Sequence, residues 1–454
     1  MIGQILRDLR ENKALQISEV EEASGIGGSH ISRIENGRRL PTVSQIQKLA
    51  SIYDISSETL LAQRESDRII HSLEYPDVAM EALNIAEQKL SYGIGYLETL
   101  NNSIYTKPLP LESRRYIGSK AKLTDWIMTT IRRETTTEGT FCDLFAGTGV
   151  VASRALEIYD RVIINDFLYS NNVIYRAFFE EGDWRQKRVC DLLDYYNTID
   201  PDSLRDNYFS THFGGKYYEQ SVAKKIGYIR QCIEEIRHEL TPKEYNILLA
   251  TLIYNIDRLA NTVGHFDAYI KKPITPRPLR LRPIDAMSYE GAEIHRDDSN
   301  LLAREISADV VYIDPPYNSR QYCRFYHLYE TLVKWDAPEL FGVALKPAPE
   351  NMSAYCTVRA VDAFRDLVSV LDTKYIVVSY NNTYKSKSNS SENKMRLEDI
   401  KEILELCGET KVFSQSHQYF NAGKTDFSDH KELLFVTKVD YERRDKAFPT
   451  LLRW

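Results

Sequence analysis

One predicted strand in this chain ends abruptly in an acid, two prolines and an aromatic residue. The run Val310-Val311-Tyr312-Ile313 is apolar and mostly β-branched, which predicts a buried parallel strand, and Asp314-Pro315-Pro316-Tyr317 follows it directly. The prolines cannot extend the strand, because they lack backbone donors and fix φ. Asp314 and Tyr317 are therefore expected just past a strand's carboxyl end, where α/β sheets place their ligands.

This set of residues could hold a planar base by its exocyclic amine. Asp314 and the carbonyl of Pro315 could each accept one amine N–H, which would stabilise positive charge developing on the nitrogen. Tyr317 could stack on such a base. The candidate catalytic residues are thus Asp314, Pro315, Pro316 and Tyr317, and no metal is required. The alternative is an ordinary strand-to-turn junction, since Asp-Pro often opens a turn.

A glycine turn upstream could hold the second substrate. Asp143-Leu144-Phe145-Ala146-Gly147-Thr148-Gly149 follows another predicted strand, and its glycines let the backbone approach a ligand closely. The third glycine of the dinucleotide fingerprint and the Lys of a phosphate-binding loop are both missing. The next strand-like run ends at Asn165 and Asp166. Asp166 is preferred over Asn165 as the acceptor of ribose hydroxyls, by the logic of nucleotide-binding α/β folds.

These motifs resemble those of the Dam-like (D12-class, alpha-group) DNA adenine N6-methyltransferases. The first stretch resembles their DPPY motif, whose Asp form points to adenine N6, the glycine turn resembles motif I, and Arg114 to Leu123 resembles motif X. The resemblance implies a Rossmann-like sheet that binds S-adenosyl-L-methionine, with Asp298 favoured over Asp297 to reach the cofactor's adenine amine. The cofactor-binding residues it implies are Tyr116, Gly118, Lys120, Asp143, Phe145, Ala146, Gly147, Thr148, Gly149, Asp166 and Asp298.

The elements that must position these residues predict one α/β catalytic domain, assigned to residues 111–176 and 293–454. Strand-like runs alternate with helical patterns, which is typical of an open, largely parallel sheet. The strand-like runs are 139–145, 161–165, 309–313, 374–379 and 432–437.

The order of the motifs resembles the alpha group and places a target-recognition insertion at 177–292. Its patterns predict mostly helices, including one opened by Thr241-Pro242. A Pro-rich segment, 271–283, carries five basic residues and no acid, so it could follow a phosphate backbone. A solvated linker is the alternative. The DNA contacts predicted in and after this insertion are Lys271, Lys272, Arg277, Arg280, Arg282, Arg320 and Arg324.

Residues 1–60 predict a compact all-α unit of four helices, and residues 61–110 predict a helical linker. The string Ile31-Ser32-Arg33-Ile34-Glu35-Asn36-Gly37 with Arg38-Arg39-Leu40-Pro41 resembles the Xre/Cro helix-turn-helix family. That resemblance places the third helix in the major groove, with Ser29, His30 and Arg33 as DNA contacts. Gly27 and Gly28 offer little to read bases with, so dimerisation or protein contact stays open as the role of this fold.

Composition restricts the setting. The net charge of −7 is unlike that of a bulk nucleic-acid binder, although local patches decide DNA contact. The six scattered cysteines form no CxxC pair, which indicates a reducing compartment without a zinc site or disulfide framework. No apolar run is long enough for a membrane span and the N-terminus lacks a signal-peptide layout. We expect a cytoplasmic, nucleoid-associated protein of a prokaryote or phage.

Taken together, these patterns predict a site-specific methyltransferase that acts on adenine N6 in duplex DNA with S-adenosyl-L-methionine. A restriction-modification system is the expected setting, with a cognate endonuclease as functional partner. Two alternatives remain, namely adenine methylation of RNA and a DNA-binding regulator with an inactive methyltransferase fold. Cytosine N4 is a weaker candidate, because Ser more often replaces Asp314 in that case.

Overall fold

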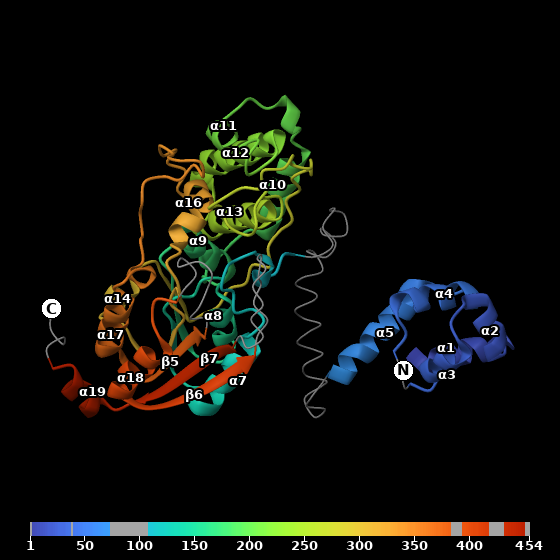
Figure 1. Ribbon diagram of the computed structural model, residues 1–454. Coiled ribbons are helices and arrows are strands. Elements are labelled where there is room, and N and C mark those ends of the chain that lie inside the picture. Colours follow the sequence, from blue (N-terminus) through green and yellow to red (C-terminus); the bar gives the residue numbers. More distant parts are fainter. Residues whose placement is uncertain (1, 38–39, 73–107, 383–392, 417–430, 450–454) are drawn as a thin grey trace. The chain divides into compact units, whose positions relative to one another are not determined.

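The computed structural model describes residues 2–37, 40–72, 108–382, 393–416 and 431–449 (Figure 1). The chain forms two compact units, residues 1–99 and 100–454. The predicted linker covers residues 61–110, and most of it, residues 73–107, lies outside the described residues. Among the described helices, none is long and apolar enough to cross a membrane.

The first unit is an all-helical bundle. Its third helix ends before Asn36-Gly37, and Thr42 caps the fourth through a reciprocal pair of hydrogen bonds with Gln45, at 3.2 and 2.9 Å. A fifth helix continues well past the predicted boundary at residue 60. The helices are α1 (Ile2–Asn12), α2 (Ile17–Ser24), α3 (Gly28–Glu35), α4 (Val43–Tyr53) and α5 (Ser57–Ser72).

A buried ion pair ties α1 to α3 inside this bundle. Arg10 donates from Nε to Glu35 Oε1 at 2.8 Å and from Nη2 to Glu35 Oε2 at 2.9 Å. Both residues are buried, and Arg10 also donates to the carbonyl of Leu15 at 2.9 Å. The two hydrogen bonds from one guanidinium to one carboxylate therefore hold α3 in a fixed orientation against α1.

Glu35→Ala is expected to destabilise the helical unit by about 3 kcal/mol, because it leaves the Arg10 guanidinium buried without its carboxylate. Thermal unfolding of the full chain followed by circular dichroism would detect this as an earlier transition. The control is Glu11→Ala, which removes an exposed partner of the same arginine and is expected to change stability by less than about 1 kcal/mol. Equal shifts in the two variants would contradict a dominant buried pair.

The second unit is built on a seven-stranded sheet in the order β3-β2-β1-β4-β5-β7-β6. The first five strands in that order are parallel, and β7 runs antiparallel to both of its neighbours, β5 and the edge strand β6. All five predicted strands are present, and β3 and β6 were missed. The strands are β1 (Thr140–Asp143), β2 (Arg161–Asn165), β3 (Ala292–His295), β4 (Ser307–Ile313), β5 (Asp372–Asn381), β6 (Gly408–Ser416) and β7 (Lys431–Val439).

Helices cover both faces of the sheet, so its central strands are buried on both sides (Figure 1). On β4, Val310 and Tyr312 pack on one face, while Val311 and Ile313 pack on the other. The first face is covered by α7 (Thr124–Glu134), α8 (Val150–Ala155) and α9 (Tyr169–Phe178), and the second by α14 (Ser299–Leu302), α17 (Ala360–Val370), α18 (Leu397–Cys407) and α19 (Tyr441–Ala447). Two-sided burial explains why the sequence of β4 reads as a continuous apolar run.

The predicted insertion is mostly helical and stands on one side of the sheet (Figure 1). Its helices are α10 (Gln186–Thr198), α11 (Tyr208–Phe213), α12 (Gln220–Glu235) and α13 (Pro242–Asp257), with Thr241 and Glu244 forming a capping box. Helices α15 (Tyr322–Phe325) and α16 (His327–Lys334) follow β4 in the chain, and α16 packs against α9 on the side of the unit that carries the insertion (Figure 1).

The Pro-rich basic segment leaves α13 without forming a helix or strand, as its prolines predict. Two asparagines clamp its second half by reciprocal side-chain bonds to the backbone. Asn197 bonds both backbone groups of Leu281 at 2.7 and 3.0 Å, and Asn255 does the same for Arg282 at 3.0 and 2.8 Å. Leu279 and Leu281 are buried between the helices. The segment is therefore a docked arm with a fixed path and not a free linker.

Candidate active site

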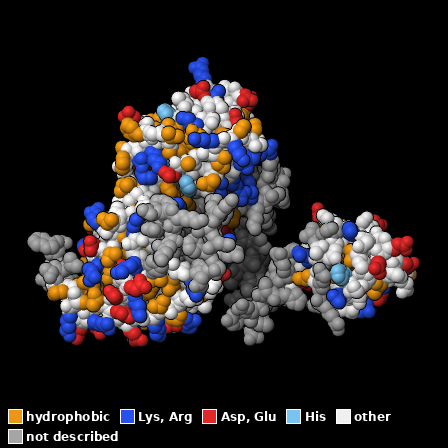
Figure 2. All heavy atoms as spheres, viewed as in Figure 1, with side chains coloured by type: hydrophobic (Ala, Val, Ile, Leu, Met, Phe, Trp, Pro, Cys, Tyr) orange, Lys and Arg blue, Asp and Glu red, His pale blue; other side chains and the backbone are white. Residues whose placement is uncertain are grey.

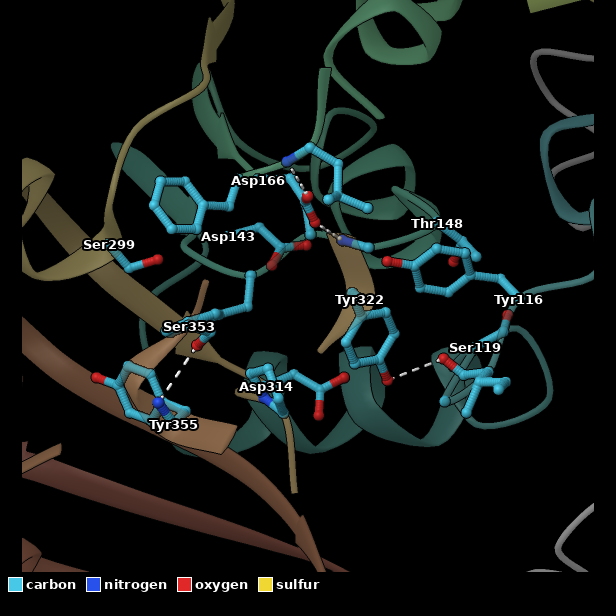
Figure 3. Close-up of a pocket in the computed structure, with 18 of the residues that line it drawn as sticks. Tyr116, Ser119, Asp143, Thr148, Asp166, Ser299, Asp314, Tyr322, Ser353 and Tyr355 are labelled. Carbon is cyan, nitrogen blue, oxygen red and sulfur yellow. Dashed lines mark hydrogen bonds between the residues drawn. The ribbon is translucent and has the colours of Figure 1, made fainter. Parts of the chain in front are cut away.

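Three neighbouring parallel strands deliver acids to one edge of the sheet. Asp143 is the last residue of β1, Asp166 follows β2 and Asp314 follows β4. All three line one cavity, and Figure 3 shows them facing the same hollow. This is the carboxyl edge, where open α/β sheets bind their ligands.

The cavity gathers most of the residues that the sequence singled out. Those that line it are Tyr116, Gly118, Lys120, Asp143, Phe145, Ala146, Gly147, Thr148, Asp166, Asp298, Asp314 and Pro316. Gly149, Pro315 and Tyr317 adjoin these residues in sequence but are not part of the lining. Asp298 belongs to the lining and its alternative Asp297 does not, and Asn165 is buried beside the cavity, with its amide donating to Leu144 O and Asp297 O at 3.1 Å.

The glycine turn adopts the conformation that its residues allow. Gly147 and Gly149 have φ of +54° and +78°, which other residues rarely adopt. A Cβ on Gly149 would lie 3.1 Å from the ring of Tyr175, so this glycine also permits close packing. Asp166 accepts the backbone N–H of Gly147 at 3.0 Å and thereby fixes the turn against the end of β2.

Asp143 is a buried carboxylate without an ordinary hydrogen-bond partner on either oxygen, within the part of the chain that the structure describes. Burial raises its pKa well above the usual value, and the carboxylates of Asp314 and Asp166 add to this. The backbone N–H groups of Phe145 and Ala152 offset part of the effect. An unpaired buried carboxylate is costly, so its position on the cavity wall suits a ligand that brings positive charge.

A compact polar network surrounds the carboxylate of Asp314. Lys120 Nζ lies 2.8 and 2.7 Å from the two carboxylate oxygens and donates to the hydroxyl of Tyr317 at 2.7 Å. Tyr317 lies within hydrogen-bond distance of Asp314 Oδ1 and also of Glu432 Oε1, at 2.5 and 2.8 Å. Glu432 accepts a further bond from Ser379 at 2.7 Å. Sequence reasoning placed Lys120 with the cofactor, whereas here it pairs with the candidate catalytic acid.

The network sets the charges of its members. Burial raises the pKa of Asp314, the Lys120 ammonium opposes this, and the Glu432 carboxylate adds to it. For Lys120, burial disfavours the ammonium, but the carboxylates of Asp314 and Glu432 outweigh burial and raise its pKa. Lys120 is therefore a cation at neutral pH, held between two carboxylates.

Aromatic rings frame the cavity mouth. Tyr116 stacks between Tyr322 and Tyr326, with ring centroids 5.3 and 4.6 Å apart, and Tyr326 accepts the backbone N–H of Ile117 at 2.8 Å. On the far wall Tyr355 meets Phe145 edge-on at 5.1 Å. Tyr355 and Glu432 were not singled out by the sequence, because each lies far along the chain from the motif it contacts and no local pattern marks it.

The predicted DNA contacts are divided between the two units. In the described part of the chain, Lys271, Lys272 and Arg280 are exposed and form no ion pair, while Arg277 donates to the carbonyl of Arg258 at 3.0 Å. Arg324 donates to the carbonyl of Pro347, and Arg320 lies 5.9 Å from the Phe325 ring. Arg282 has its backbone held by the Asn255 clamp. In α3, Ser29 and Arg33 are exposed and His30 is partly exposed.

This arrangement defines a class of enzyme. A Rossmann-like sheet with an acid-lined cavity at its carboxyl edge, a Phe-x-Gly-x-Gly turn and an Asp-Pro-Pro-Tyr strand end belongs to the methyltransferase fold. Residues 116–382 match the D12 class N6 adenine-specific DNA methyltransferases, and the chain belongs to this family. Residues 6–60 match a helix-turn-helix family, so the first unit is a helix-turn-helix domain.

Individual relatives agree with both assignments. The Type II methyltransferase M.NlaIII of Neisseria lactamica is 32% identical over 330 residues, which cover 70% of this chain and 95% of that protein. The Type II methyltransferase M.FokI of Planomicrobium okeanokoites is 30% identical, over 72% of this chain and 53% of its own. The HTH-type transcriptional regulator SinR of Bacillus subtilis is 33% identical over 76 residues, which cover 16% of this chain and 63% of the regulator.

Proposed function

We propose that this enzyme transfers a methyl group from S-adenosyl-L-methionine to N6 of an adenine at a specific site in duplex DNA, with the base flipped out of the helix. A restriction-modification system with a cognate endonuclease is the proposed setting. The observation that carries the proposal is the carboxylate of Asp314, held by Lys120 and Tyr317 on the wall of a cavity that also contains the unpaired Asp143.

The residues of the cavity fit S-adenosyl-L-methionine. Among the described residues, no side chain pairs with the Asp143 carboxylate, and the cofactor carries both an ammonium and a sulfonium charge. Asp166 and Asp298 line the cavity with carboxylate acceptors for ribose hydroxyls and an adenine amine, and Phe145 and Tyr355 supply flat apolar walls. When bound, the cofactor supplies a methyl group already activated by the positive sulfur.

Asp314 and its surroundings would hold and polarise the target amine. Its carboxylate accepts one N–H and the carbonyl of Pro315 accepts the other, which turns the nitrogen lone pair towards the methyl donor. These acceptors are fixed by the end of β4 before the base arrives, so little reorganisation is needed as positive charge develops. The ring of Tyr317 packs edge-on against Tyr380 at 4.5 Å, which fixes its orientation beside the flipped base.

DNA would lie over the insertion and its arm. Lys and Arg side chains gather on the part of the large unit that carries the insertion helices (Figure 2). Lys271, Lys272 and Arg280 are exposed, and the clamp on Leu281 and Arg282 holds the backbone next to Arg280. We assign phosphate contacts to these residues and to Arg277, Arg282, Arg320 and Arg324, and DNA contact by the separate helix-turn-helix domain to Ser29, His30 and Arg33.

Removing charge from the arm is expected to weaken DNA binding equally at all sequences. Lys271→Ala, Lys272→Ala and Arg280→Ala should each lower the slope of log K against log salt concentration by about 0.9, as expected for one lost phosphate contact. Fluorescence anisotropy with a labelled DNA duplex, at salt concentrations from about 50 to about 300 mM, measures this slope. The control is Lys446→Ala on α19, whose side chain is also exposed. An unchanged slope in all three arm variants would show that the arm does not touch DNA.

The function is tested by expressing the protein in a host that lacks DNA methylation and mapping modified adenines by long-read sequencing. N6-methyladenine confined to one short sequence is the expected result. Purified protein with labelled cofactor, offered duplex DNA and RNA side by side, separates the DNA activity from the RNA alternative. A folded protein that modifies neither would overturn the proposal and favour a regulator with an inactive fold.

A further inference from the structure

The hydroxyl of Tyr317 has one proton and two carboxylates within reach. Its oxygen lies 2.5 Å from Asp314 Oδ1 and 2.8 Å from Glu432 Oε1, and it accepts an N–H of Lys120 at 2.7 Å. Since the proton can serve only one carboxylate at a time, the two acids compete for it. A small rotation of the C–O bond is enough to exchange them.

Glu432 is built into the sheet at a fixed place. It is the second residue of β7, pairs in register with Asn381 of β5, and is 5% exposed. Ser379, also on β5, donates its hydroxyl to Glu432 Oε1 at 2.7 Å. A buried carboxylate that receives hydroxyls from two sides has no freedom to turn away, so its position relative to Tyr317 is set by the sheet itself.

The charge of Glu432 bears directly on Asp314. Lys120 Nζ lies 2.7 Å from Asp314 and 3.4 Å from Glu432. With Glu432 present, one ammonium faces two carboxylates, and the group as a whole is negative. Without it, the ammonium would neutralise Asp314 and leave no net charge to stabilise the positive nitrogen that forms during methyl transfer.

We propose that Glu432 is a positioning residue for methyl transfer, which takes over the Tyr317 hydroxyl and offsets the Lys120 ammonium so that Asp314 is released to accept the target amine. This inference rests on the proposed adenine methylation. As the amine donates to Asp314 Oδ1, the Tyr317 proton turns to Glu432, and no bond is broken in this exchange. Glu432 touches neither the base nor the cofactor and acts only through Tyr317 and Lys120.

Glu432→Gln tests this role in the full-length enzyme. Because Gln keeps the shape but loses the charge, binding of S-adenosyl-L-methionine and of duplex DNA is expected to stay within about threefold of wild type. The single-turnover methylation rate is expected to fall about 10²-fold. Flipping, followed by the fluorescence of 2-aminopurine at the target position, should persist, since the substitution leaves the Tyr317 ring in place.

The pH profile gives a signature that a merely structural role would lack. Methylation requires ionised Asp314, whose pKa is raised by burial and by Glu432, so activity is lost as pH falls through that raised value. Glu432→Gln removes one cause of the raised pKa, and the acid limb of the rate profile should therefore move to lower pH. The charged or titratable groups that face Asp314 are Lys120, Tyr317, Glu432, Asp143 and Tyr312.

Matched variants decide between outcomes. Glu244→Gln removes another buried carboxylate, at the start of α13, and should lower thermal stability without changing the methylation rate of the folded enzyme. Ser379→Ala loosens Glu432 without altering charge and should slow methylation severalfold, which keeps the inference testable if Glu432→Gln does not fold. A wild-type rate in either Glu432→Gln or Ser379→Ala, or an unmoved acid limb, overturns the inference. Inactive wild-type enzyme would instead overturn the proposed function.

Discussion

Replacing Asp314 with Ala should abolish methylation, with a loss of at least about 10³-fold in single-turnover rate, while S-adenosyl-L-methionine still binds. The carboxylate is the charged one of the two acceptors that the end of β4 fixes before the base arrives, so its loss removes a preorganised charge that water cannot replace. Binding of the cofactor persists because Asp143, Asp166 and the glycine turn are untouched. Methyl incorporation and isothermal titration measure the two effects separately.

The same strand offers the control for that experiment. Asp309 lies near the start of β4, at the opposite edge of the sheet, where it accepts the backbone N–H of Thr140 at 2.8 Å and pairs with Lys374. Asp309→Asn should therefore leave the methylation rate of the folded enzyme unchanged. Full activity in Asp314→Ala, or equal losses in both variants, would rule out the assigned role of Asp314.

Asp143→Asn is expected to stabilise the cofactor-free protein and to weaken cofactor binding. Its buried carboxylate has a pKa raised by burial and by two neighbouring acids, so its ionised form costs stability above that pKa. A neutral isostere removes this cost, and we expect a gain of about 1–2 kcal/mol in unfolding free energy at neutral pH. Losing the charge that faces the cofactor should weaken its binding about 10- to 100-fold.

The sign of the pH dependence checks the cause. Because the folded-state pKa of Asp143 is raised, its cost disappears as pH falls and the carboxylate becomes protonated. The difference in melting temperature between Asp143→Asn and wild type should therefore be largest at neutral pH and shrink in acid. Asp160→Asn, an exposed site just before β2, should show no such difference. A destabilised Asp143→Asn at neutral pH would show that the carboxylate supports the empty fold.

The central strands of the sheet could be predicted, because a strand that is buried on both faces contains a run of consecutive apolar residues. β1, β2, β4 and β5 each contain a short apolar stretch that is buried, such as Val162 to Ile164 in β2 and Ile376 to Val378 in β5. β3 and β6 were not predicted, because neither strand is buried on both faces. β3 is four residues long and nowhere fully buried, and β6 is a largely exposed, polar edge strand. Neither has an alternation that separates it from a loop.

Some residues of the candidate site could be predicted from the sequence, and others could not. Residues within one motif, such as Asp143 with Gly147 or Asp314 with Pro316, could be found because a single turn of chain positions them. Glu432 could not, since it reaches Tyr317 across 115 residues and only through the pairing of β7 with β5. Lys120 was found through a local motif, but its partner could not be, because the ion pair joins residues 194 apart.

The reversed direction of β7 has a consequence for how the enzyme matures during synthesis. β7 is the last strand in chain order of the described part, yet it inserts between β5 and β6, and β6 has no other partner in the sheet. A nascent chain that has already made its glycine turn and its Asp-Pro-Pro-Tyr end still lacks Glu432 and the closing strand. This edge of the sheet can therefore close only after β7 has left the ribosome. Chains that have not yet reached β7 would carry the glycine turn and the Asp-Pro-Pro-Tyr end without Glu432, so the polar network around Asp314 would still be incomplete.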